Sequence, residues 1–339
     1  MFSRVDMEKR EENILSPYAC LSKDSKGRLN EELECDLRSV FQHDRDRILH
    51  SKAFRRLKHK TQVFIAPEGD HYRTRLTHTL EVSQIARTIA RGLILNEDLT
   101  EAIALGHDLG HTPFGHAGEE VFKKVSNNKF SHNVHSLRVV DKLEIRSGGK
   151  KGLNLSYEVR DGILHHTGDG KPSTLEGKIV RIADRIAYIN HDIDDSIRAG
   201  ILDIDELPKE ALNILGYTHS KRIDTMVRDI IVSSYKKNDI KRSKDVKEAS
   251  STLRRFLFDN VYIGSRAKTE EDKAQRLLEN LFYYYLKNIN EIPDKFRNIE
   301  EDTASEQIVI DYIAGMSDRF AINKGRELYI PSPWYATEN

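Results

Sequence analysis

The chain of 339 residues has few cysteines and no long apolar run. Cys20 and Cys35 have neither metal-ligand nor redox spacing, so we expect reduced thiols rather than a disulfide framework. The longest apolar runs, such as GLIL at 92–95, fall far short of the roughly 20 residues needed to cross a bilayer. The amino-terminal stretch MFSRVDMEKREEN lacks the apolar centre of a signal peptide. We therefore expect a cytoplasmic protein with no membrane partner.

The chain also has no excess of charge of either sign. Lys and Arg together number 54, and so do Asp and Glu. This balance excludes a global positive field that would wrap DNA or draw the protein to a membrane, although 32% charged residues make the surface polar. A site for phosphate or nucleic acid must therefore be local.

Alternating β-branched residues, which indicate strands, are scarce, whereas helical spacing runs through most of the chain. In 78–95, apolar residues repeat at threes and fours, which predicts a strong amphipathic helix. A longer helix is predicted over 173–197, where Ser173 and Glu176 stand at capping-box spacing. Further helices are expected over 136–145, 157–166, 222–235, 251–262, 274–286 and 307–316. The pattern predicts an all-α fold.

Breaks in this pattern predict loops and an organisation in three parts. Segments rich in Gly, Pro or charge predict loops at 66–74, 146–154, 167–173 and 235–248. We divide the chain into an amino-terminal arm (1–42), which carries the weakest structural signal, a core (43–216), and a helical region (217–339) packed on that core. The boundary near 200–216 could instead separate an independent appendage.

The stretch 106–120, GHDLGHTPFGHAGEE, holds three histidines, an aspartate and two glutamates. His107 and Asp108 stand at the end of an apolar helical segment, where neighbouring side chains point about 100° apart. They can share one metal ion only if it lies over the edge between them. His111 stays near this pair whether the helix continues or Gly110 ends it; a histidine that caps the helix is equally compatible with the local sequence.

Two more ligands for such an ion would come from other helices. His78 opens the helix at 78–95, and Asp184 lies on the apolar-rich face of the helix at 173–197, where a bundle could aim both inward. Two imidazoles and two carboxylates suit a divalent Mn, Mg, Fe, Ni, Co or Zn ion, and the lack of thiolate disfavours a closed structural zinc site. Spacing alone does not join these residues, and each by itself could be an ordinary surface group.

A histidine for proton transfer follows in the same stretch. His116 precedes Glu119 by one helical turn, so the carboxylate can hold the imidazole's tautomer and raise its basicity. This pair could act as a general acid. Capping of the helix by the same residues is compatible with that role.

The ordered motifs RTRLTHTLEV, LGHDLGHTPFGHAGEE, SHNVHSLRV and IADRIAYINHDIDD resemble the HD superfamily of metal-dependent phosphohydrolases. Within it they are most similar to the deoxynucleoside triphosphate triphosphohydrolases, typified by the dGTPases, from about residue 43 to at least 200. The resemblance implies an HD-domain helical bundle with additional C-terminal helices. It also implies that the catalytic metal is bound by His78, His107, Asp108 and Asp184.

The resemblance further assigns catalytic and substrate-binding residues. It implies that His116 is catalytic, with Glu119 as its acidic partner and His132 as a further histidine. The implied substrate contacts are phosphate binding by Arg75, His111 and Arg185, phosphate or sugar contact by Tyr188, and recognition of the deoxyribose 3′-hydroxyl by Asp192 with Gln62. Relatives often carry glutamine where this chain has His135, and we expect that departure to affect nucleotide preference more than activity.

We therefore expect metal-dependent hydrolysis of a deoxynucleoside triphosphate, dGTP or several dNTPs, to deoxynucleoside and inorganic triphosphate. The alternatives are another HD-type nucleotide phosphohydrolase (nucleotidase, phosphodiesterase or alarmone hydrolase) or a non-catalytic module that binds nucleotide or single-stranded nucleic acid. The basic residues of 45–75 could bind an effector nucleotide or single-stranded DNA, although most charge runs are solvated faces. Relatives are commonly hexamers, so we expect a homo-oligomer.

Overall fold

The computed structural model describes residues 3–62, 73–262 and 268–331, and these residues form helices and three isolated β-bridges. The α-helices are α1 (Arg4–Ile14), α2 (Val40–Leu49), α3 (Lys52–Arg56), α4 (Arg75–Gly92), α5 (Glu97–Gly106), α6 (Gly115–Val125), α7 (His132–Arg138), α8 (Tyr157–His165), α9 (Leu175–Arg198), α10 (Lys209–Leu215), α11 (His219–Ser234), α12 (Lys244–Leu257), α13 (Lys268–Lys287), α14 (Asp294–Arg297), α15 (Ser305–Ala314) and α16 (Asp318–Tyr329). Single turns of other helix types are η1 (Ser22–Asp24), η2 (Leu57–His59), η3 (Val139–Leu143), η4 (Ser147–Gly149), η5 (Ile204–Glu206), η6 (Phe258–Tyr262) and η7 (Ile289–Glu291). The predicted all-α class is confirmed. No helix within the described ranges is long and apolar enough to span a bilayer.

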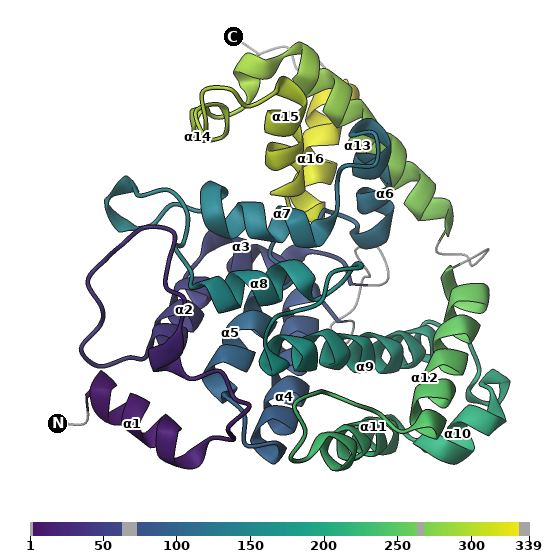
Figure 1. The fold of residues 1–339 in the computed structure, drawn as a ribbon. Coiled ribbons are helices and arrows are strands. Elements are labelled where there is room, and N and C mark those ends of the chain that lie inside the picture. Colours follow the sequence, from purple (N-terminus) through teal and green to yellow (C-terminus); the bar gives the residue numbers. More distant parts are fainter. Residues whose placement is uncertain (1–2, 63–72, 263–267, 332–339) are drawn as a thin grey trace, which may run out of the picture.

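The larger hydrophobic core is built around α4, α5 and α9, which pack against one another in the middle of the molecule (Figure 1). Helices α2 and α8 cover α5, and α11 and α12 pack on α9. The apolar stripe predicted over 78–95 faces this core, where Val82 and Ile89 are fully buried. Because α4, α5 and α9 lie in direct contact, polar residues placed on their facing sides come close together.

A second core joins α6 to α13, α15 and α16, above the first in Figure 1. Phe122 of α6 packs here with Leu278, Val309 and Ile313 from the carboxy-terminal helices. The first core meanwhile extends through α10 to α12. Side chains on both sides of residue 216 thus share one core, and the predicted division at that residue stays a prediction.

Buried polar side chains tie the carboxy-terminal helices to the turn after α5. The Lys60 ammonium donates to the carbonyls of His111 and Ala314, the latter at 2.8 Å. The Asp318 carboxylate accepts from Thr61 N at 2.9 Å, from the Thr61 hydroxyl, and from Phe114 N at 3.0 Å. Burial, with a contribution from Arg56, lowers the pKa of Lys60 to about 7. The end of α15 and the start of α16 therefore hold the turn that follows His107.

Several local predictions were wrong where tertiary contacts competed. The predicted helix over 136–145 changes at Val139 into the turn η3, since Leu153 N donates to Val140 O and Gly152 N to Glu144 O. The predicted loop over 235–248 ends early, because Ser243 caps α12. Most of the predicted loop at 66–74 lies outside the described residues. The amino-terminal arm carries more structure than its weak sequence signal suggested. It contains α1, and after this helix Ser16 N donates to Ile94 O at 2.7 Å.

The capping box predicted for Ser173 and Glu176 was also wrong. Thr174 caps α9 by accepting from Gly177 N at 3.1 Å, while Ser173 donates to Asp161 through both its amide and its hydroxyl. Glu176 is fully buried, and its Oε1 accepts from the amides of Cys20 and Asn96, each at 3.1 Å. This carboxyl therefore anchors the amino-terminal arm to the core.

Glu176 gives a prediction for the pH dependence of stability. Burial raises its pKa from 4.5 to about 7, so the folded state binds more protons than the unfolded chain between these pH values. The free energy of unfolding should therefore fall as pH rises through this window. Glu176→Gln keeps an oxygen that can accept from the two backbone amides but cannot titrate. It should therefore reduce the pH-dependent fall in the free energy of unfolding by roughly 2–3 kcal/mol. The measurement is chemical denaturation across the window, with the exposed Glu301→Gln as control; equal slopes for Glu176→Gln and the unmodified chain would contradict the prediction.

Candidate metal centre and catalytic site

The turn between α5 and α6 carries the histidine-rich motif. The α5 helix ends at Gly106, and His107 stands at its carboxy-terminal cap. Gly110 lies against α7, and a Cβ there would lie 2.2 Å from Ser136 N. This close approach lets Ser136 Oγ accept from Gly110 N at 2.9 Å and donate to His107 O at 2.8 Å. The turn is thereby fixed at both ends, and a larger residue than glycine would open it.

Four side chains from two helices and this turn converge at one point. His78 comes from α4, Asp184 from α9, and His107 and Asp108 from the turn. The ligand atoms of His78, His107 and Asp108 lie within 4.8 Å of one another. Asp184 Oδ1 lies 3.1 Å from His78 Nε2 and 3.8 Å from His107 Nε2, and Asp108 Oδ2 lies 3.6 Å from His107 Nε2. The structure thus brings together the whole predicted ligand set.

The hydrogen bond of His107 leaves one ring nitrogen facing this point. His107 Nδ1 lies 2.6 Å from Ala104 O, and a carbonyl can only accept, so Nδ1 carries the proton. In the neutral ring Nε2 then bears a lone pair. This atom is buried and has no hydrogen-bond partner among the described residues. A buried acceptor without a donor is costly unless a cation binds it.

His78 also has an Nε2 lone pair that faces this point, because of a series of hydrogen bonds from Glu81 through His191. His191 Nε2 lies 3.0 Å from Glu81 Oε2, which assigns the His191 proton to Nε2 and makes its Nδ1 an acceptor. His78 Nδ1, at 3.3 Å, then donates to His191 Nδ1. The lone pair of His78 Nε2 consequently faces the carboxylate oxygen of Asp184 at 3.1 Å. Two acceptors so close together need a cation between them.

The charges and spacing fit a divalent metal. Burial alone would raise the pKa of Asp108, but its surroundings, among them the Arg75 charge at 2.5 Å, hold that pKa well below its usual range. Ligand atoms bound about 2.0–2.2 Å from a metal lie about 3.0–3.4 Å from one another, close to the separations here. These two imidazoles and two carboxylates could therefore hold one divalent ion.

A second cluster of histidines lies next to the metal ligands. The ring of His111 stacks on that of His132, with centroids 4.7 Å apart, and ligand atoms of both lie within 4.8 Å of Asp108. His132 opens α7, and His166, at the end of α8, places its Nε2 3.2 Å from His132 Nε2. The two clusters therefore form one continuous polar site.

The hydrogen bonds of His132 assign it a positive charge. His166 Nδ1 lies 2.7 Å from Ile163 O, so His166 carries its proton there and its Nε2 accepts from His132. His132 Nδ1 lies 3.0 Å from Glu119 Oε2, which also accepts. Both nitrogens of His132 thus donate. Burial would lower the pKa of His132, but Glu119 outweighs it and raises that pKa.

Glu119 therefore has a second partner beside the predicted one. The sequence paired it with His116, whereas the hydrogen bond found here holds His132. Glu119 still lies within 4.8 Å of ring nitrogens of His116 and His111. Phe114 and Gly115, both with positive φ, turn the chain so that α6 begins with His116 at the exposed edge of the site. Desolvation by the surrounding protein and the Arg75 charge lower the pKa of His116.

The structure places the remaining predicted contacts around this site at different distances from its centre. Arg75 is buried and binds Asp108 Oδ2 at 2.5 Å, so it reaches the metal ligands directly. Gln62 lies beside the start of α6, with its backbone oxygen 3.5 Å from the position a Gly115 Cβ would take. Tyr188 and Asp192 continue along α9 from Asp184, one and two turns on.

Asp192 and Gln62 each present a buried oxygen, Oδ1 and Oε1, that has no hydrogen-bond partner in the described part of the chain. Burial, and then Asp195, raises the pKa of Asp192 well above its usual range. Tyr188 is half-buried, and burial raises its pKa to about 12. Burial, and then the charge of Arg185, lowers the pKa values of Arg181 and Arg242. No contact joins Arg185 to the metal ligands in the described ranges.

Sequence reasoning missed Glu81, His166 and His191. Glu81 and His191 were detectable, because each stands about one or two helical turns from a predicted ligand on α4 or α9. His166 gave no comparable signal, since its position depends on how α8 packs on α7 and α5. His135, where relatives often carry glutamine, faces away from the histidine cluster, with Nδ1 2.8 Å from Gly110 O and Nε2 3.5 Å from Asp311 Oδ1.

The chain from Glu81 through His191 predicts an effect on metal affinity. His191→Ala removes the acceptor that fixes the His78 tautomer, and Mn²⁺ should bind the metal-free protein about 10–100-fold more weakly. His191→Gln, which again offers an acceptor oxygen, should recover part of the affinity. His219→Ala is the matched control, because its ring stacks on the far side of His191. Calorimetric titration measures the Mn²⁺ affinity, and the melting temperature of each metal-free variant should equal that of the unmodified chain. Equal Mn²⁺ affinity for His191→Ala and the unmodified chain would refute the prediction.

Comparison with known proteins agrees with this geometry. The family model described as HD domain matches residues 75–189, and the one described as phosphohydrolase-associated domain matches residues 240–327. A deoxyguanosinetriphosphate triphosphohydrolase-like protein of Caldanaerobacter subterraneus subsp. tengcongensis is 60% identical, covering 97% of this chain and 96% of that protein. Proteins with the same description from Clostridium tetani and Geobacter sulfurreducens are 50% and 40% identical, covering 97% and 98% of this chain and 97% and 99% of their own length. The chain therefore belongs to the HD-domain phosphohydrolase family, in the group of deoxyguanosinetriphosphate triphosphohydrolase-like proteins.

Proposed function

We propose that the chain hydrolyses a deoxynucleoside triphosphate, dGTP or several dNTPs, to deoxynucleoside and inorganic triphosphate with the help of a divalent metal. The observation that carries this proposal is the shared position of Asp108, which belongs both to the metal ligands and to the cluster with His111 and His132. The candidate metal ligands thus adjoin a cluster of cationic and acidic side chains, and the two together are suited to binding a phosphate ester. The relatives' description as deoxyguanosinetriphosphate triphosphohydrolase-like proteins supports the same substrate class.

In this proposal His78, His107, Asp108 and Asp184 hold the metal, which supplies Lewis acidity and lowers the pKa of a bound water. Arg75 lies against Asp108 and can reach a phosphate oxygen at the same place. His132, protonated between Glu119 and His166, stabilises negative charge on the phosphate, and His111 beside it contributes a further contact. These groups are fixed before substrate arrives.

Residues farther from the metal ligands would contact the leaving group and the sugar. His116 stands at the exposed edge, where it would pass a proton to the departing 5′-oxygen. Asp192 and Gln62 have buried oxygens free to accept from the deoxyribose 3′-hydroxyl. Tyr188 would contact the phosphate or sugar, and Arg185 would bind the distal phosphates.

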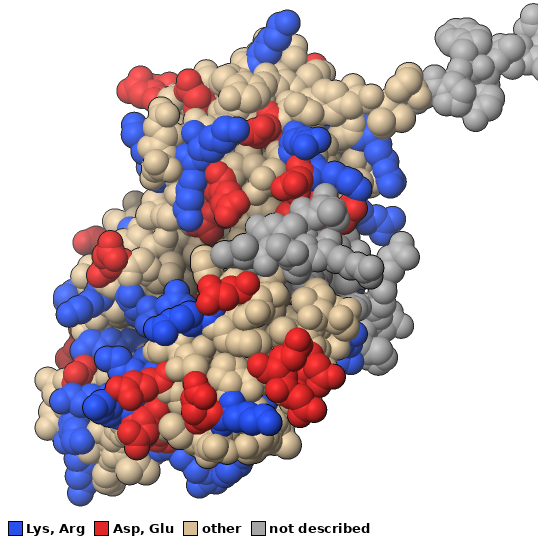
Figure 2. Space-filling view, turned by 90° about the vertical axis from the view of Figure 1, so that its right-hand side faces the viewer, with Lys and Arg blue, Asp and Glu red and all other residues tan. Residues whose placement is uncertain are grey.

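Oligomeric assembly, effector binding and a cytoplasmic location complete the proposal, with a hexamer as the expected oligomer. On the face in Figure 2, acidic and basic groups are interspersed, so an effector would need a local site. Much of the basic segment 45–75 already binds protein groups, since Arg47 pairs with Glu32 and Arg73 with Asp194. A nucleotide or single strand there would have to use exposed groups such as Arg55 and Lys58.

Product analysis tests the proposed reaction. Each of the four dNTPs, alone and mixed, with Mg²⁺ or Mn²⁺, should yield deoxynucleoside and inorganic triphosphate, separated by anion-exchange chromatography. Removing the metal with EDTA should abolish turnover, and adding it back should restore turnover. His116→Ala should lower kcat by about 10²–10⁴-fold. Orthophosphate or pyrophosphate as product would instead indicate a nucleotidase or another HD hydrolase, and nucleic-acid affinity without hydrolysis would indicate a binding module.

Glu119→Gln tests the charge assigned to His132. The amide cannot hold an imidazolium as a carboxylate does, so kcat should fall by about 10²-fold or more, with a smaller change in KM. Glu120→Gln is the matched control, because that exposed neighbour accepts from Gln275 at 2.8 Å across the surface. A kcat for Glu119→Gln equal to that of Glu120→Gln would rule out the assigned role.

A further inference from the structure

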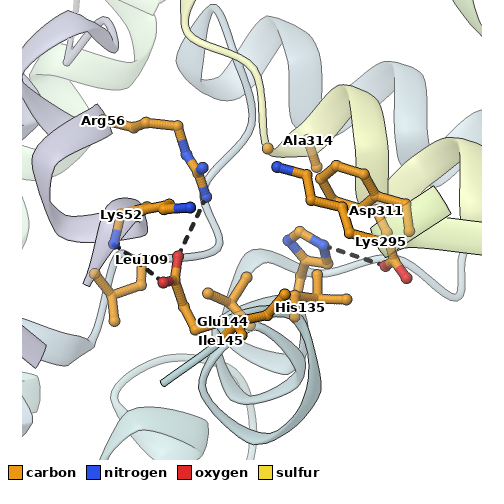
Figure 3. A pocket seen from close by; sticks show the side chains of 13 residues that line it. Lys52, Arg56, Leu109, His135, Glu144, Ile145, Lys295, Asp311 and Ala314 are labelled. Carbon is orange, nitrogen blue, oxygen red and sulfur yellow. Dashed lines mark hydrogen bonds and ion pairs between the residues drawn. The ribbon is translucent and has the colours of Figure 1, made fainter. Parts of the chain in front are cut away.

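A small cavity of about 30 Å³ lies behind the metal-binding turn, at the seam between α3, α7 with η3, and the carboxy-terminal helices α14 and α15. Figure 3 shows Lys52 and Arg56 extending into it from α3 and Lys295 extending into it from α14. His135, Leu109 and Ala314 line the other sides. Three cationic side chains from two separate parts of the fold therefore point into one space.

The carboxylates that line this cavity are already bound by other groups. Glu144 accepts from the amides of Lys52 and Ala53 at 3.0 and 2.7 Å, and Arg56 reaches it at 3.5 Å. Asp311 accepts from Arg138 at 2.7 and 2.9 Å and from the Gln307 amide at 2.7 Å. Neither carboxylate is left to neutralise the lysines.

Arg56 is paired with Glu144, whereas the charges of the two lysines are not balanced. Within the described residues the ammonium groups of Lys52 and Lys295 make no ion pair, and Lys295 contacts only the ring of Phe296, at 4.9 Å. Burial, and then the charges of Arg56 and Lys52, lower the pKa of Lys295. Both lysines are exposed at the mouth of the recess, and a bound anion would reduce the repulsion among the three like charges.

We propose that this recess binds a phosphate group, held by Lys52, Arg56 and Lys295. The cavity has room for roughly two water-sized groups, enough for part of a tetrahedral oxyanion whose other oxygens stay at the mouth. A second cavity of about 300 Å³ shares Leu143, Ile145 and Lys295 with it and continues past Asn298 and Ile299. The phosphate can therefore be free or belong to a small phosphate ester whose organic part enters the second cavity.

Binding there would act on the metal-binding turn from behind. Leu109, one wall of the recess, directly follows the ligand Asp108. His135, another wall, contacts Gly110 O at 2.8 Å. Ala314 accepts from Lys60, which also donates to His111 O. An anion that joins α3 to α14 would thus stiffen the support of the turn, a regulatory role distinct from the reaction itself.

The test measures binding of inorganic phosphate and of ribose 5-phosphate to the full chain by calorimetry, in EDTA and at constant ionic strength. EDTA removes the metal, so the result does not depend on the proposed hydrolysis. Lys52→Gln with Lys295→Gln should weaken binding at least tenfold. The control pair Lys129→Gln with Lys247→Gln removes the same charge from exposed positions outside the recess and should leave affinity unchanged.

The two ligands distinguish the sources of the phosphate. Tighter binding of ribose 5-phosphate, lost in the same double variant, would identify a phosphate ester, and equal binding would identify free phosphate. Both variants should keep the melting temperature and helical circular dichroism of the unmodified chain. Equal affinities for the recess variant and the control, or no binding of either ligand to the unmodified chain, would overturn the proposal.

Discussion

The structure depends on one electrostatic constraint, the meeting of four hydrogen-bond acceptors at a single buried point. His78 Nε2 and Asp184 Oδ1 face each other at 3.1 Å, and His107 Nε2 faces the same point without a donor. Such an arrangement is costly in a folded protein unless a cation occupies the point. The packing of α4, α5 and α9 into one core is what brings these side chains together. Fold and site are therefore two results of the same contacts.

The same residue type performs different tasks here because its outer hydrogen bond differs. A backbone carbonyl takes the Nδ1 proton of His107, which leaves Nε2 as a metal ligand. Glu119 and His166 instead make both nitrogens of His132 donors, which gives that ring a positive charge. Ala104 and His166, two of the partners that decide these proton positions, lie outside the motif 106–120. Their removal would change the chemistry of the site while leaving its visible residues in place.

The carboxy-terminal helices are part of the site's support. Lys60 joins the end of α15 to the turn, and Asp318 at the start of α16 accepts from Phe114 N just before His116. The second core also takes in α6, which carries His116 and Glu119. A shift of these helices would therefore reach the proposed acid and the metal ligands together. This connection explains why a recess at the seam can influence a site on the other side of the turn.

The sequence by itself determined the all-α class and the residues that converge at the candidate metal centre, because helical periodicity is local and the HD motifs are specific. It did not show the contact of Glu119 with His132, because spacing joins Glu119 to His116 one helical turn away, whereas the 3.0 Å contact with His132 depends on how the chain returns after α6. Thr174 replaced Ser173 as the cap of α9 for a similar reason, because Asp161 from α8 binds Ser173. Glu81, His166 and His191 acquired their roles through contacts between helices far apart in the chain. Spacing shows which residues share a helix face; tertiary packing alone decides which faces meet, and so where each proton resides.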